Sequence, residues 1–366
     1  MKKIVLNILL FILCGLTFSC NPQIYVSDIK PAATHTPTGE AGGAGGGGGG
    51  GGSVVTNSIK NYTSSDYPTF ASYTSAVKAS IISHNFLNSV GNVKVPTGEQ
   101  LLKASYLMNL FYDRVKNLSG TEPLVITPAE QAEFGTLNLQ VFKLAMGSIF
   151  YYGVEEMNPK IYGHGVALMK SNFGSMANKL LIEVPHPMWD SNTGELGGEV
   201  MDTMNPALFI MAGHHRYNST SPSTTTVPGN SGQFRTDAAH ETALFFHIAH
   251  TVFAQDITYV VQLHGYGSGM TDLYAAIPPI EFVLASGAKQ NPPAILTTLK
   301  AAFTAAGMNG AIYPTDSTSL GATENVQGSH VRERFPDRFI HVETRTELRA
   351  NATQRAKIVT ALQSTL

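Results

Sequence analysis

Residues 179–190 read KLLIEVPHPMWD, and this stretch decides the expected fold because a short apolar run ends abruptly in histidine and aspartate. Five further short apolar runs follow, and the gaps between them leave room for crossover helices over 237–253 and 292–306. The five runs are residues 207–212, 257–263, 281–284, 310–313 and 338–342. Such alternation is typical of a three-layer α/β domain with a central mixed, largely parallel sheet, which we expect over residues 159–366.

Upstream of this stretch, from residue 60 to 158, the pattern is helical. Thr127-Pro128-Ala129-Glu130 has the form of a capping box with proline at the first helical position. Apolar residues recur at helical intervals over 101–115 and with mixed spacing over 134–145. We therefore predict a helical N-terminal region with a packing or regulatory role.

The N-terminus carries the pattern of an export signal. Lys2 and Lys3 precede an apolar run over residues 4–18, which is too short for a comfortable membrane span but suits a signal peptide. The run ends in Ser19-Cys20, which resembles a relaxed lipobox, and the resemblance implies a signal peptide over 1–19 and thioether lipidation of Cys20. The alternative is an ordinary cleaved signal with an incidental cysteine. The glycine-rich stretch within residues 20–59 is expected to be a disordered tether.

Composition excludes several classes of protein and site. Cys14 and Cys20 are the only cysteines, so the mature chain would hold at most one, and neither disulfides nor thiolate metal sites are expected. Without Lys2 and Lys3 the 24 basic residues fall to 22 against 26 acidic ones, a net charge of about −4, and no basic run predicts nucleic-acid binding. We expect an exported protein that faces the periplasm or the cell surface and contacts the membrane only through its lipid anchor.

Polar residues gather where the predicted strands end. Four strand ends deliver histidine, carboxylate or arginine side chains: His186 and Asp190 after 179–184, His214, His215 and Arg216 after 207–212, His264 after 257–263, and Glu343, Arg345 and Arg349 after 338–342. Ligands of open α/β sheets bind at the carboxyl ends of the strands. We therefore expect these side chains to share one site.

These residue types are those that metal-dependent hydrolysis uses. Catalytic zinc takes three protein ligands from histidine and carboxylate side chains and keeps one position for water. The metal lowers the pKa of that water, and a nearby carboxylate accepts its proton. An arginine binds a substrate carboxylate well because its planar guanidinium matches two oxygens. One zinc ion is therefore the cofactor that we expect.

The order PHP…D (185–190), GHHR (213–216), QLHG (262–265) and HVET (341–344) resembles the zinc-dependent amidohydrolase and carboxypeptidase superfamily. Within it, N-formylglutamate amidohydrolases are most similar, and peptidoglycan amidases and zinc carboxypeptidases are more distant. A branch of bacterial lipoproteins is also similar over about residues 160–350, where this chain reads EVPHP (183–187), DAAH (237–240) and TENVQG (323–328). The resemblance implies a phosphorylase/hydrolase-like fold, with His186 and His264 as metal ligands and Glu343 as the general base.

The third metal ligand is left open. Carboxypeptidases place it three residues after the first histidine, where this chain has Trp189. Asp190, Glu195 and Glu199 are the candidates, of which Asp190 is nearest and Glu199 has a spacing more similar to that of the peptidoglycan amidases. His240, at the start of the helix expected over 237–253, is a further candidate as a ligand or a substrate contact.

Contacts to the oxyanion or the substrate are expected from a set of polar residues: His215 and Arg216, Arg345 or Arg349, His240, Asn325 and Gln327. The arginines would bind a substrate carboxylate or stabilise the oxyanion. The two amides would donate hydrogen bonds to substrate or only cap their own loop. For Glu343 the alternative to catalysis is a buried salt bridge to a neighbouring arginine.

The sequence favours a metal-dependent hydrolase that cleaves an amide bond in a peptide, an acyl-amino acid or a cell-wall fragment. The alternative is a binding or adhesion lipoprotein that keeps the same fold without catalysis, because fold similarity does not carry activity with it. A serine hydrolase is disfavoured, since the chain has no Gly-x-Ser-x-Gly elbow.

Overall fold

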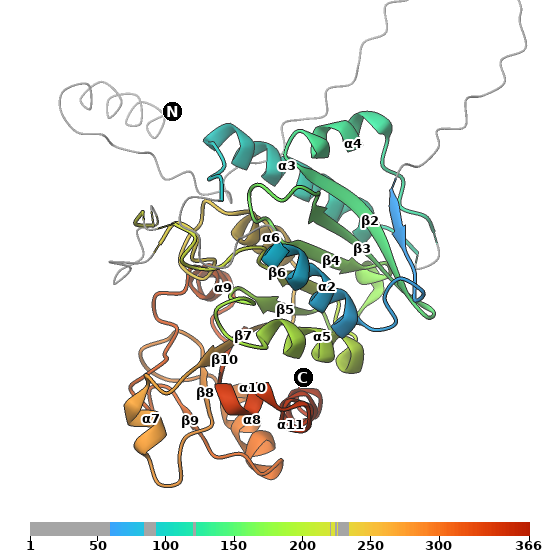
Figure 1. The fold of residues 1–366 in the computed structure, drawn as a ribbon. Coiled ribbons are helices and arrows are strands. Elements are labelled where there is room, and N and C mark those ends of the chain that lie inside the picture. The colour runs from blue at the N-terminus through green and yellow to red at the C-terminus, as the bar shows by residue number, and fades with distance from the viewer. Residues whose placement is uncertain (1–58, 84–92, 120–121, 220, 224, 226–233) are drawn as a thin grey trace, which may run out of the picture. The chain divides into compact units, whose positions relative to one another are not determined.

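The computed structural model describes residues 59–83, 93–119, 122–219, 221–223, 225 and 234–366 (Figure 1). All of them belong to one compact unit, Gly45–Leu366. The predictions for the signal peptide, for Cys20 and for nearly all of the tether lie outside the described residues. No helix within the described ranges is long and apolar enough to cross a membrane.

One ten-stranded mixed sheet organises the fold, with the order β1-β2-β3-β4-β6-β5-β7-β10-β8-β9 (Figure 1). In chain order the strands are β1 (Lys60–Tyr62), β2 (Leu139–Met146), β3 (Ile149–Glu156), β4 (Val166–Lys170), β5 (Leu180–Val184), β6 (Leu208–Met211), β7 (Tyr259–Tyr266), β8 (Phe282–Ala285), β9 (Gly310–Ile312) and β10 (Phe339–Arg345). The central strands β6, β5, β7 and β10 run parallel, whereas β2, β3, β4 and β6 pair antiparallel in series. The six strands expected downstream of residue 159 are confirmed within a few residues at each end, and so is the α/β class.

Helices cover both faces of the sheet, which gives three layers (Figure 1). One face carries α2 (Phe70–Ser83), α5 (Thr193–Met204), α8 (Ala294–Ala305) and α11 (Ala352–Gln363). The other face carries α3 (Gly98–Lys116), α4 (Pro128–Gly135), α6 (Phe245–Phe253) and α9 (Val326–Arg334). Three short helices, η2 (Phe173–Ser175), α7 (Thr271–Ala275) and α10 (Thr346–Ala350), lie between strands or at their ends.

Side chains alternate between the two faces of the central strands, so that core residues point to one face and site residues to the other. Leu263 of β7 and Val342 of β10 belong to the apolar core on the side of α5 and α11. Successive side chains of a strand point to opposite faces. The next residues, His264 and Glu343, therefore lie on the side that α6 and α9 cover. Because β7 and β10 are parallel neighbours, their register places His264 directly beside Glu343.

The region over 60–158 departs from the helical prediction. Helices α2, α3 and α4 are present, and the capping box is confirmed, because Thr127 and Glu130 each accept a hydrogen bond from the other's backbone N–H. Residues after α4 form β2 and β3 instead of more helix, and the sheet continues across residue 158 through the pairing of β3 with β4. The aromatic and β-branched residues of β3 favour a strand, and Gly147, with φ of +60°, closes the hairpin.

The helix expected over 237–253 begins only at Phe245. The Asp237 carboxylate accepts a hydrogen bond from the backbone N–H of Ala239 at 3.2 Å. Such local bonds from an aspartate side chain compete with helical hydrogen bonds and favour a turn. The residues before α6 therefore form turns, which place Asp237 against the strand ends.

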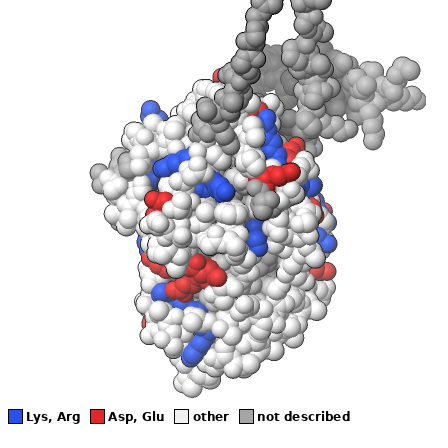
Figure 2. Space-filling view, turned by 90° about the vertical axis from the view of Figure 1, so that its right-hand side faces the viewer, with Lys and Arg blue, Asp and Glu red and all other residues white. Residues whose placement is uncertain are grey.

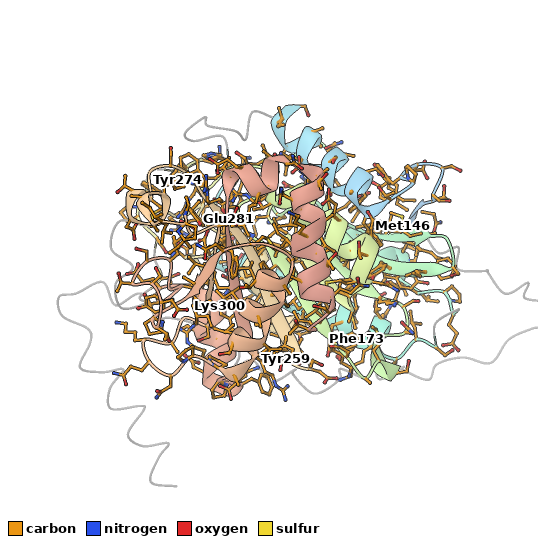
Figure 3. All side chains as sticks on the ribbon, turned by 90° about the horizontal axis from the view of Figure 1, so that it is seen from below. Met146, Phe173, Tyr259, Tyr274, Glu281 and Lys300 are labelled. Atoms are coloured by element: carbon orange, nitrogen blue, oxygen red, sulfur yellow. The ribbon has the colours of Figure 1, made fainter. Side chains whose placement is uncertain are left out.

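The two halves of the sheet lie at opposite sides of the molecule. Seen from below, Met146 and Phe173 lie on one side, and Tyr274 and Glu281 on the other (Figure 3). On the face shown in Figure 2, basic and acidic side chains are interspersed between broad uncharged areas. That face therefore has no extended basic patch, which agrees with the absence of a basic run in the sequence.

Candidate metal centre

The carboxyl ends of β5 and β7 bring together His186, Asp190 and His264. His186 Nδ1 lies 3.4 Å from Asp190 Oδ2, and His264 Nδ1 lies 3.2 Å from the same oxygen. The centroids of the two imidazole rings are 4.9 Å apart, and all three side chains are buried. Two ring nitrogens and one carboxylate oxygen thus face one another in an arrangement that can hold a metal ion.

A turn after β5 explains why Asp190 lies beside His186. The backbone N–H of Asp190 donates to His186 O at 2.9 Å, and Thr193 Oγ1 donates to Asp190 O at 2.8 Å. One helical turn brings side chains four residues apart to the same side. Trp189 points elsewhere and is 48% exposed. The backbone N–H of Gly265 then holds Asp190 Oδ2 at 3.1 Å.

Nε2 of each imidazole, the ring nitrogen that does not face Asp190, lies beside a hydrogen-bond acceptor. His186 Nε2 lies 2.8 Å from Asp237 Oδ1, and His264 Nε2 lies 2.8 Å from Gln262 Oε1. Carboxylate and amide oxygens only accept, so each neutral ring carries its proton on Nε2. The lone pair on each Nδ1 is then directed at the Asp190 side, as metal binding requires.

Charges around the site favour a cation at its centre. Burial would raise the pKa of Asp190, but the adjoining imidazoles of His186 and His264 lower it well below the usual range. Burial and the charge of Arg216 push the pKa of His186 down, yet the carboxylates of Asp237 and Asp190 raise it overall. Burial lowers the pKa of His264 to about 4. An ionised Asp190 and a neutral His264 are the forms that bind metals.

Glu343 completes the site from β10. Its side chain is buried, and Oε2 has no hydrogen-bond partner among the described residues. Burial and then the charge of Asp190 raise the pKa of Glu343 well above its ordinary value, against the opposing charges of Arg349 and Arg216. A buried carboxylate of raised pKa beside a metal site is suited to accept a proton.

His264, His341 and Glu343 form a second group with metal-ligand spacing. His341 Nε2 lies 3.7 Å from Glu343 Oε1, and the rings of His341 and His264 are 4.4 Å apart. However, His264 has only one nitrogen to offer, because Gln262 holds its Nε2. That nitrogen faces Asp190, so the group of His186, Asp190 and His264 is the better candidate for a metal.

The donor set fits zinc. Two imidazoles and one carboxylate are the ligand types of a catalytic zinc site. His186 Nδ1 is buried and has no hydrogen-bond partner among the described residues. Buried polar atoms are almost always satisfied, so such an atom needs an explanation, and a role as metal ligand provides one.

The other residues after β6 surround this centre without joining it. Arg216 forms an ion pair with Asp237 and so supports the carboxylate that holds His186. His215 packs edge-on against the exposed ring of Trp189, with centroids 5.2 Å apart. Burial lowers the pKa of His215 to about 4, so this ring is neutral at physiological pH. His214 is buried as well, and its pKa is also lowered to about 4 by burial.

The two arginines after β10 differ in location. Arg349 is buried beneath the site, where it donates to Ser191 O at 2.7 Å and to Thr344 O. It thereby ties the segment of Asp190 to β10 and does not face solvent. Arg345 instead pairs with Glu347 and lies over the ring of Tyr274.

Three candidates for the third ligand position lie away from Asp190. Glu199 accepts from Arg355 Nε at 2.9 Å, and Glu195 accepts from Lys78 Nζ at 2.8 Å. Both glutamates belong to α5, and neither joins the histidines. His240 Nδ1 lies 3.0 Å from Asp237 Oδ1, so it contacts the carboxylate that holds His186.

Asn325 and Gln327 are buried side chains that contact Gln262. The Asn325 side chain also accepts from the backbone N–H of Gly328 at 2.8 Å, which caps α9. The Gln327 side chain donates to Ala238 O at 2.8 Å. Both amides therefore act within the fold, behind His264.

Three polar residues that support the ligands, Glu183, Asp237 and Gln262, lie in the quoted motifs but had no role in the prediction from sequence. Glu183 and Gln262 are completely buried, and apolar residues flank each of them on its strand. A charged or amide side chain inside a buried strand was the available signal, because such groups are buried only when they are hydrogen-bonded. For Asp237, the contact with His186 spans 51 residues and has no local signal.

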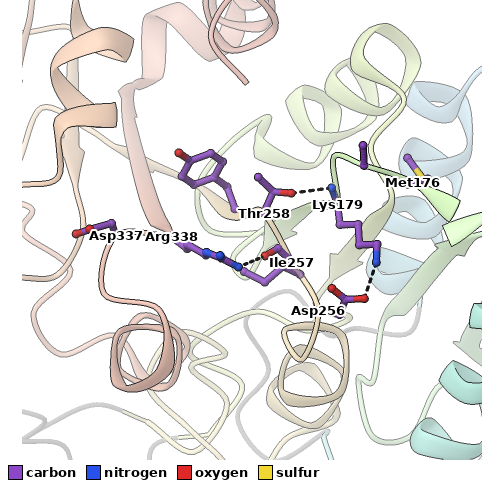
Figure 4. A pocket seen from close by; sticks show the side chains of 9 residues that line it. Met176, Lys179, Asp256, Ile257, Thr258, Asp337 and Arg338 are labelled. Carbon is purple, nitrogen blue, oxygen red and sulfur yellow. Dashed lines mark hydrogen bonds and ion pairs between the residues drawn. The ribbon is translucent and has the colours of Figure 1, made fainter. Parts of the chain in front are cut away.

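A cavity of about 430 Å³ lies at the amino ends of β5, β7 and β10, away from the metal centre (Figure 4). Three of its four charged side chains, those of Lys179, Asp256 and Arg338, already have partners. Lys179 Nζ lies 2.5 Å from Asp256 Oδ2, and Arg338 Nη1 donates to Ile257 O at 2.6 Å. Here β5, β7 and β10 present their amino ends, whereas α/β folds bind ligands at the carboxyl ends of parallel strands.

No protein-family model matches the sequence, and no curated protein does. Solved structures show distant similarity. A bacteriophage poly-gamma-glutamate hydrolase is 14% identical with a TM-score of 0.33, over 51% of this chain and 82% of that one. A metallo-carboxypeptidase from Burkholderia cenocepacia is 10% identical with a TM-score of 0.32, over 66% of this chain and 69% of that one. An aspartoacylase family protein from Mesorhizobium loti is 11% identical with a TM-score of 0.30, over 62% and 66%.

At these identities and TM-scores the similarity is distant and leaves function to the geometry of the site. The expected nearness to N-formylglutamate amidohydrolases and to a bacterial lipoprotein branch stays a prediction from the sequence motifs.

Proposed function

We propose that this protein is a zinc-dependent hydrolase of amide bonds, with His186, Asp190 and His264 as metal ligands and Glu343 as general base. One observation carries the proposal: Nδ1 of both histidines converges on one carboxylate oxygen, and the register of β7 and β10 sets Glu343 beside His264. When bound, zinc supplies a Lewis acid that lowers the pKa of water.

The side chains of this chain would handle the proton. Glu343 accepts a proton at its carboxylate from the attacking water and then donates it to the departing amine. Arg216 lies close enough to influence the pKa of Glu343, and its positive charge would stabilise negative charge that develops on the carbonyl oxygen. His215 beside Trp189 would line the approach to the site.

The proposed substrates are short peptides, acyl-amino acids or cell-wall fragments.

We also propose, from the sequence, that the protein is exported and anchored through a lipid on Cys20. A Cys20→Ser variant should then move from the detergent phase to the aqueous phase when membranes are partitioned. Retention of this variant in the detergent phase would argue against the anchor.

The test of the main proposal compares Glu343→Gln with the unaltered protein. Hydrolysis of a panel of dipeptides, N-acyl amino acids and peptidoglycan fragments should fall by about 10²-fold or more, because the variant has no general base. Zinc content, measured by mass spectrometry of the metal, should stay the same, because Glu343 is not one of the three assigned ligands. Unchanged turnover would refute the role of Glu343. A zinc-loaded protein that cleaves no member of the panel would favour a binding protein on the same fold.

A further inference from the structure

We propose that Glu183 and Gln262 are positioning residues that set the tautomer of His264 and so make it a metal ligand. The inference rests on the proposed metal site but not on the reaction. Neither residue has a part in the proposed hydrolysis, and both are completely buried. Their carboxylate and amide need a reason to lie in the centre of an apolar sheet.

A row of polar side chains crosses the three central strands one step behind the metal centre. Glu183 of β5 pairs in register with Gln262 of β7, and Gln262 pairs with His341 of β10. Residues two apart on a strand lie on the same face. Gln262 is therefore directly behind His264, on the side that α6 and α9 cover.

Gln262 is oriented from two sides. Its Nε2 donates to Glu183 Oε2 at 3.0 Å, and more weakly to Gln327 Oε1 at 3.4 Å. Its Oε1 accepts from Asn325 Nδ2 and lies 2.8 Å from His264 Nε2. Glu183 can only accept and Asn325 Nδ2 can only donate, so both partners select the same orientation of the amide.

This orientation decides which nitrogen of His264 is free. An amide oxygen facing Nε2 requires the ring proton on Nε2, which leaves the Nδ1 lone pair for a metal beside Asp190. A reversed Gln262 would present its NH₂ group to His264. The ring would then accept at Nε2 and carry its proton on Nδ1, where it would oppose a metal ion.

Glu183 is itself held by a chain of histidines. His250 Nδ1 lies 2.6 Å from Glu183 Oε1, and His250 Nε2 lies 3.0 Å from His330 Nδ1. Asn325 is fixed independently, because its oxygen caps α9. The EVPHP, QLHG and TENVQG segments, which are far apart in the sequence, thus meet at one amide group.

The experiment replaces Glu183 with glutamine, which keeps the shape but can donate as well as accept, so that Gln262 is free to reverse. The zinc dissociation constant of Glu183→Gln, measured by competition with a chromogenic chelator, should rise about 10- to 100-fold. Imidazole ¹⁵N shifts of the zinc-free protein should show His264 moving from the Nε2–H toward the Nδ1–H tautomer. Neither readout uses enzyme activity.

Glu156→Gln is the matched control. Glu156 is also a buried glutamate, and its carboxylate accepts from the backbone N–H groups of Ile161, Tyr162 and His164 at 2.6 to 2.9 Å. It lies on β3, away from the metal centre. Its replacement should lower stability and leave zinc affinity and the His264 tautomer unchanged.

The inference is overturned if Glu183→Gln keeps both the zinc affinity and the tautomer of the unaltered protein, or if Glu156→Gln weakens zinc binding equally. If the unaltered protein binds no zinc, the proposed metal site fails, and the tautomer of His264 alone decides this inference. If Glu183→Gln does not fold, Asn325→Asp serves instead. It removes the donor to Gln262 Oε1 but keeps the oxygen that caps α9, and the same tautomer change is expected.

Discussion

Two groups of histidines lie on the same side of the sheet, and they differ in what their ring nitrogens face. In the metal centre, His186 and His264 direct Nδ1 toward one carboxylate, Asp190. The second group, which we call the histidine cluster, consists of His247, His250 and His330 on α6 and α9, with ring centroids 5.1 to 6.2 Å apart. Among the residues that the structure describes, the histidine cluster does not have the ligand spacing of a metal site, whereas the metal centre does.

The difference shows that burial and a high density of histidine do not by themselves make a metal site. Burial and neighbouring histidines lower the pKa of His247 far below the usual range, and burial lowers that of His330 to about 3. In the metal centre, carboxylates raise the pKa of His186 in spite of burial. Two rings that face one carboxylate oxygen therefore distinguish the metal centre, because among the described residues of the histidine cluster only His250 faces a carboxylate, that of Glu183.

Removal of single histidines should separate the two groups most sharply. His186→Ala and His264→Ala should each abolish stoichiometric zinc, because two remaining ligands do not hold a catalytic zinc ion. His247→Ala should keep zinc at about one ion per chain, although it removes a buried side chain. Metal analysis of the three purified variants checks this, with circular dichroism to show that each is folded. Loss of zinc in His247→Ala alone would invert the assignment.

Acid should destabilise the protein through the histidine cluster. The folded pKa values of His247 and His330 lie below the unfolded value of about 6.5, so below that pH the unfolded chain binds more protons than the folded one. Stability should be unaffected by these groups above pH 6.5 and fall as the pH drops toward 3, by up to about 1.4 kcal/mol per pH unit for each of the two histidines. His330→Gln should make the fall between pH 6.5 and 5 shallower in urea denaturation. An equal slope in this variant would contradict the prediction.

A methyl group at Gly265 should disturb the metal centre from below. A Cβ there would lie 1.8 Å from Arg349 Cζ, so the buried guanidinium would have to move. Overpacking of this kind costs about 1–3 kcal/mol. Gly265→Ala should therefore lower the free energy of unfolding by that amount and weaken zinc binding, whereas Gly267→Ala, where the nearest atom is 3.7 Å from the added Cβ, is the control. Equal stability of the two variants would show that Arg349 is not held against Gly265.

Of these substitutions, Glu199→Gln is expected to have the smallest effect on stability and zinc content. Its ion pair with Arg355 is partly exposed, with 26% and 12% of the two side chains accessible, and such pairs contribute about 0–1 kcal/mol. Glu199→Gln should change the free energy of unfolding by no more than this and leave zinc content intact. Loss of zinc in this variant would restore Glu199 as a candidate ligand.

Local patterns in the sequence account for the central strands and for part of the site. The apolar runs that become β5, β7 and β10 are short and bounded by polar residues, so their positions could be predicted, although β7 and β10 each continue three residues beyond the predicted end. Asp190 lies four residues after His186, a separation that one helical turn brings together. The hairpin of β2 and β3 was missed because apolar residues of mixed spacing are compatible with a helix until their pairing partner is known.

By itself, then, the sequence determined which residues with metal-binding side chains lie near the carboxyl ends of strands. It could do so because the approximate position of a strand follows from the local pattern of apolar residues. Only the tertiary structure decided that β7 and β10 are neighbours, that Asp237 and Gln262 hold the two imidazoles, and that Glu199 pairs with Arg355 instead. The physical reason is that hydrogen-bond partners of buried side chains are chosen by register and helix packing between segments far apart in the chain. No local pattern contains that information.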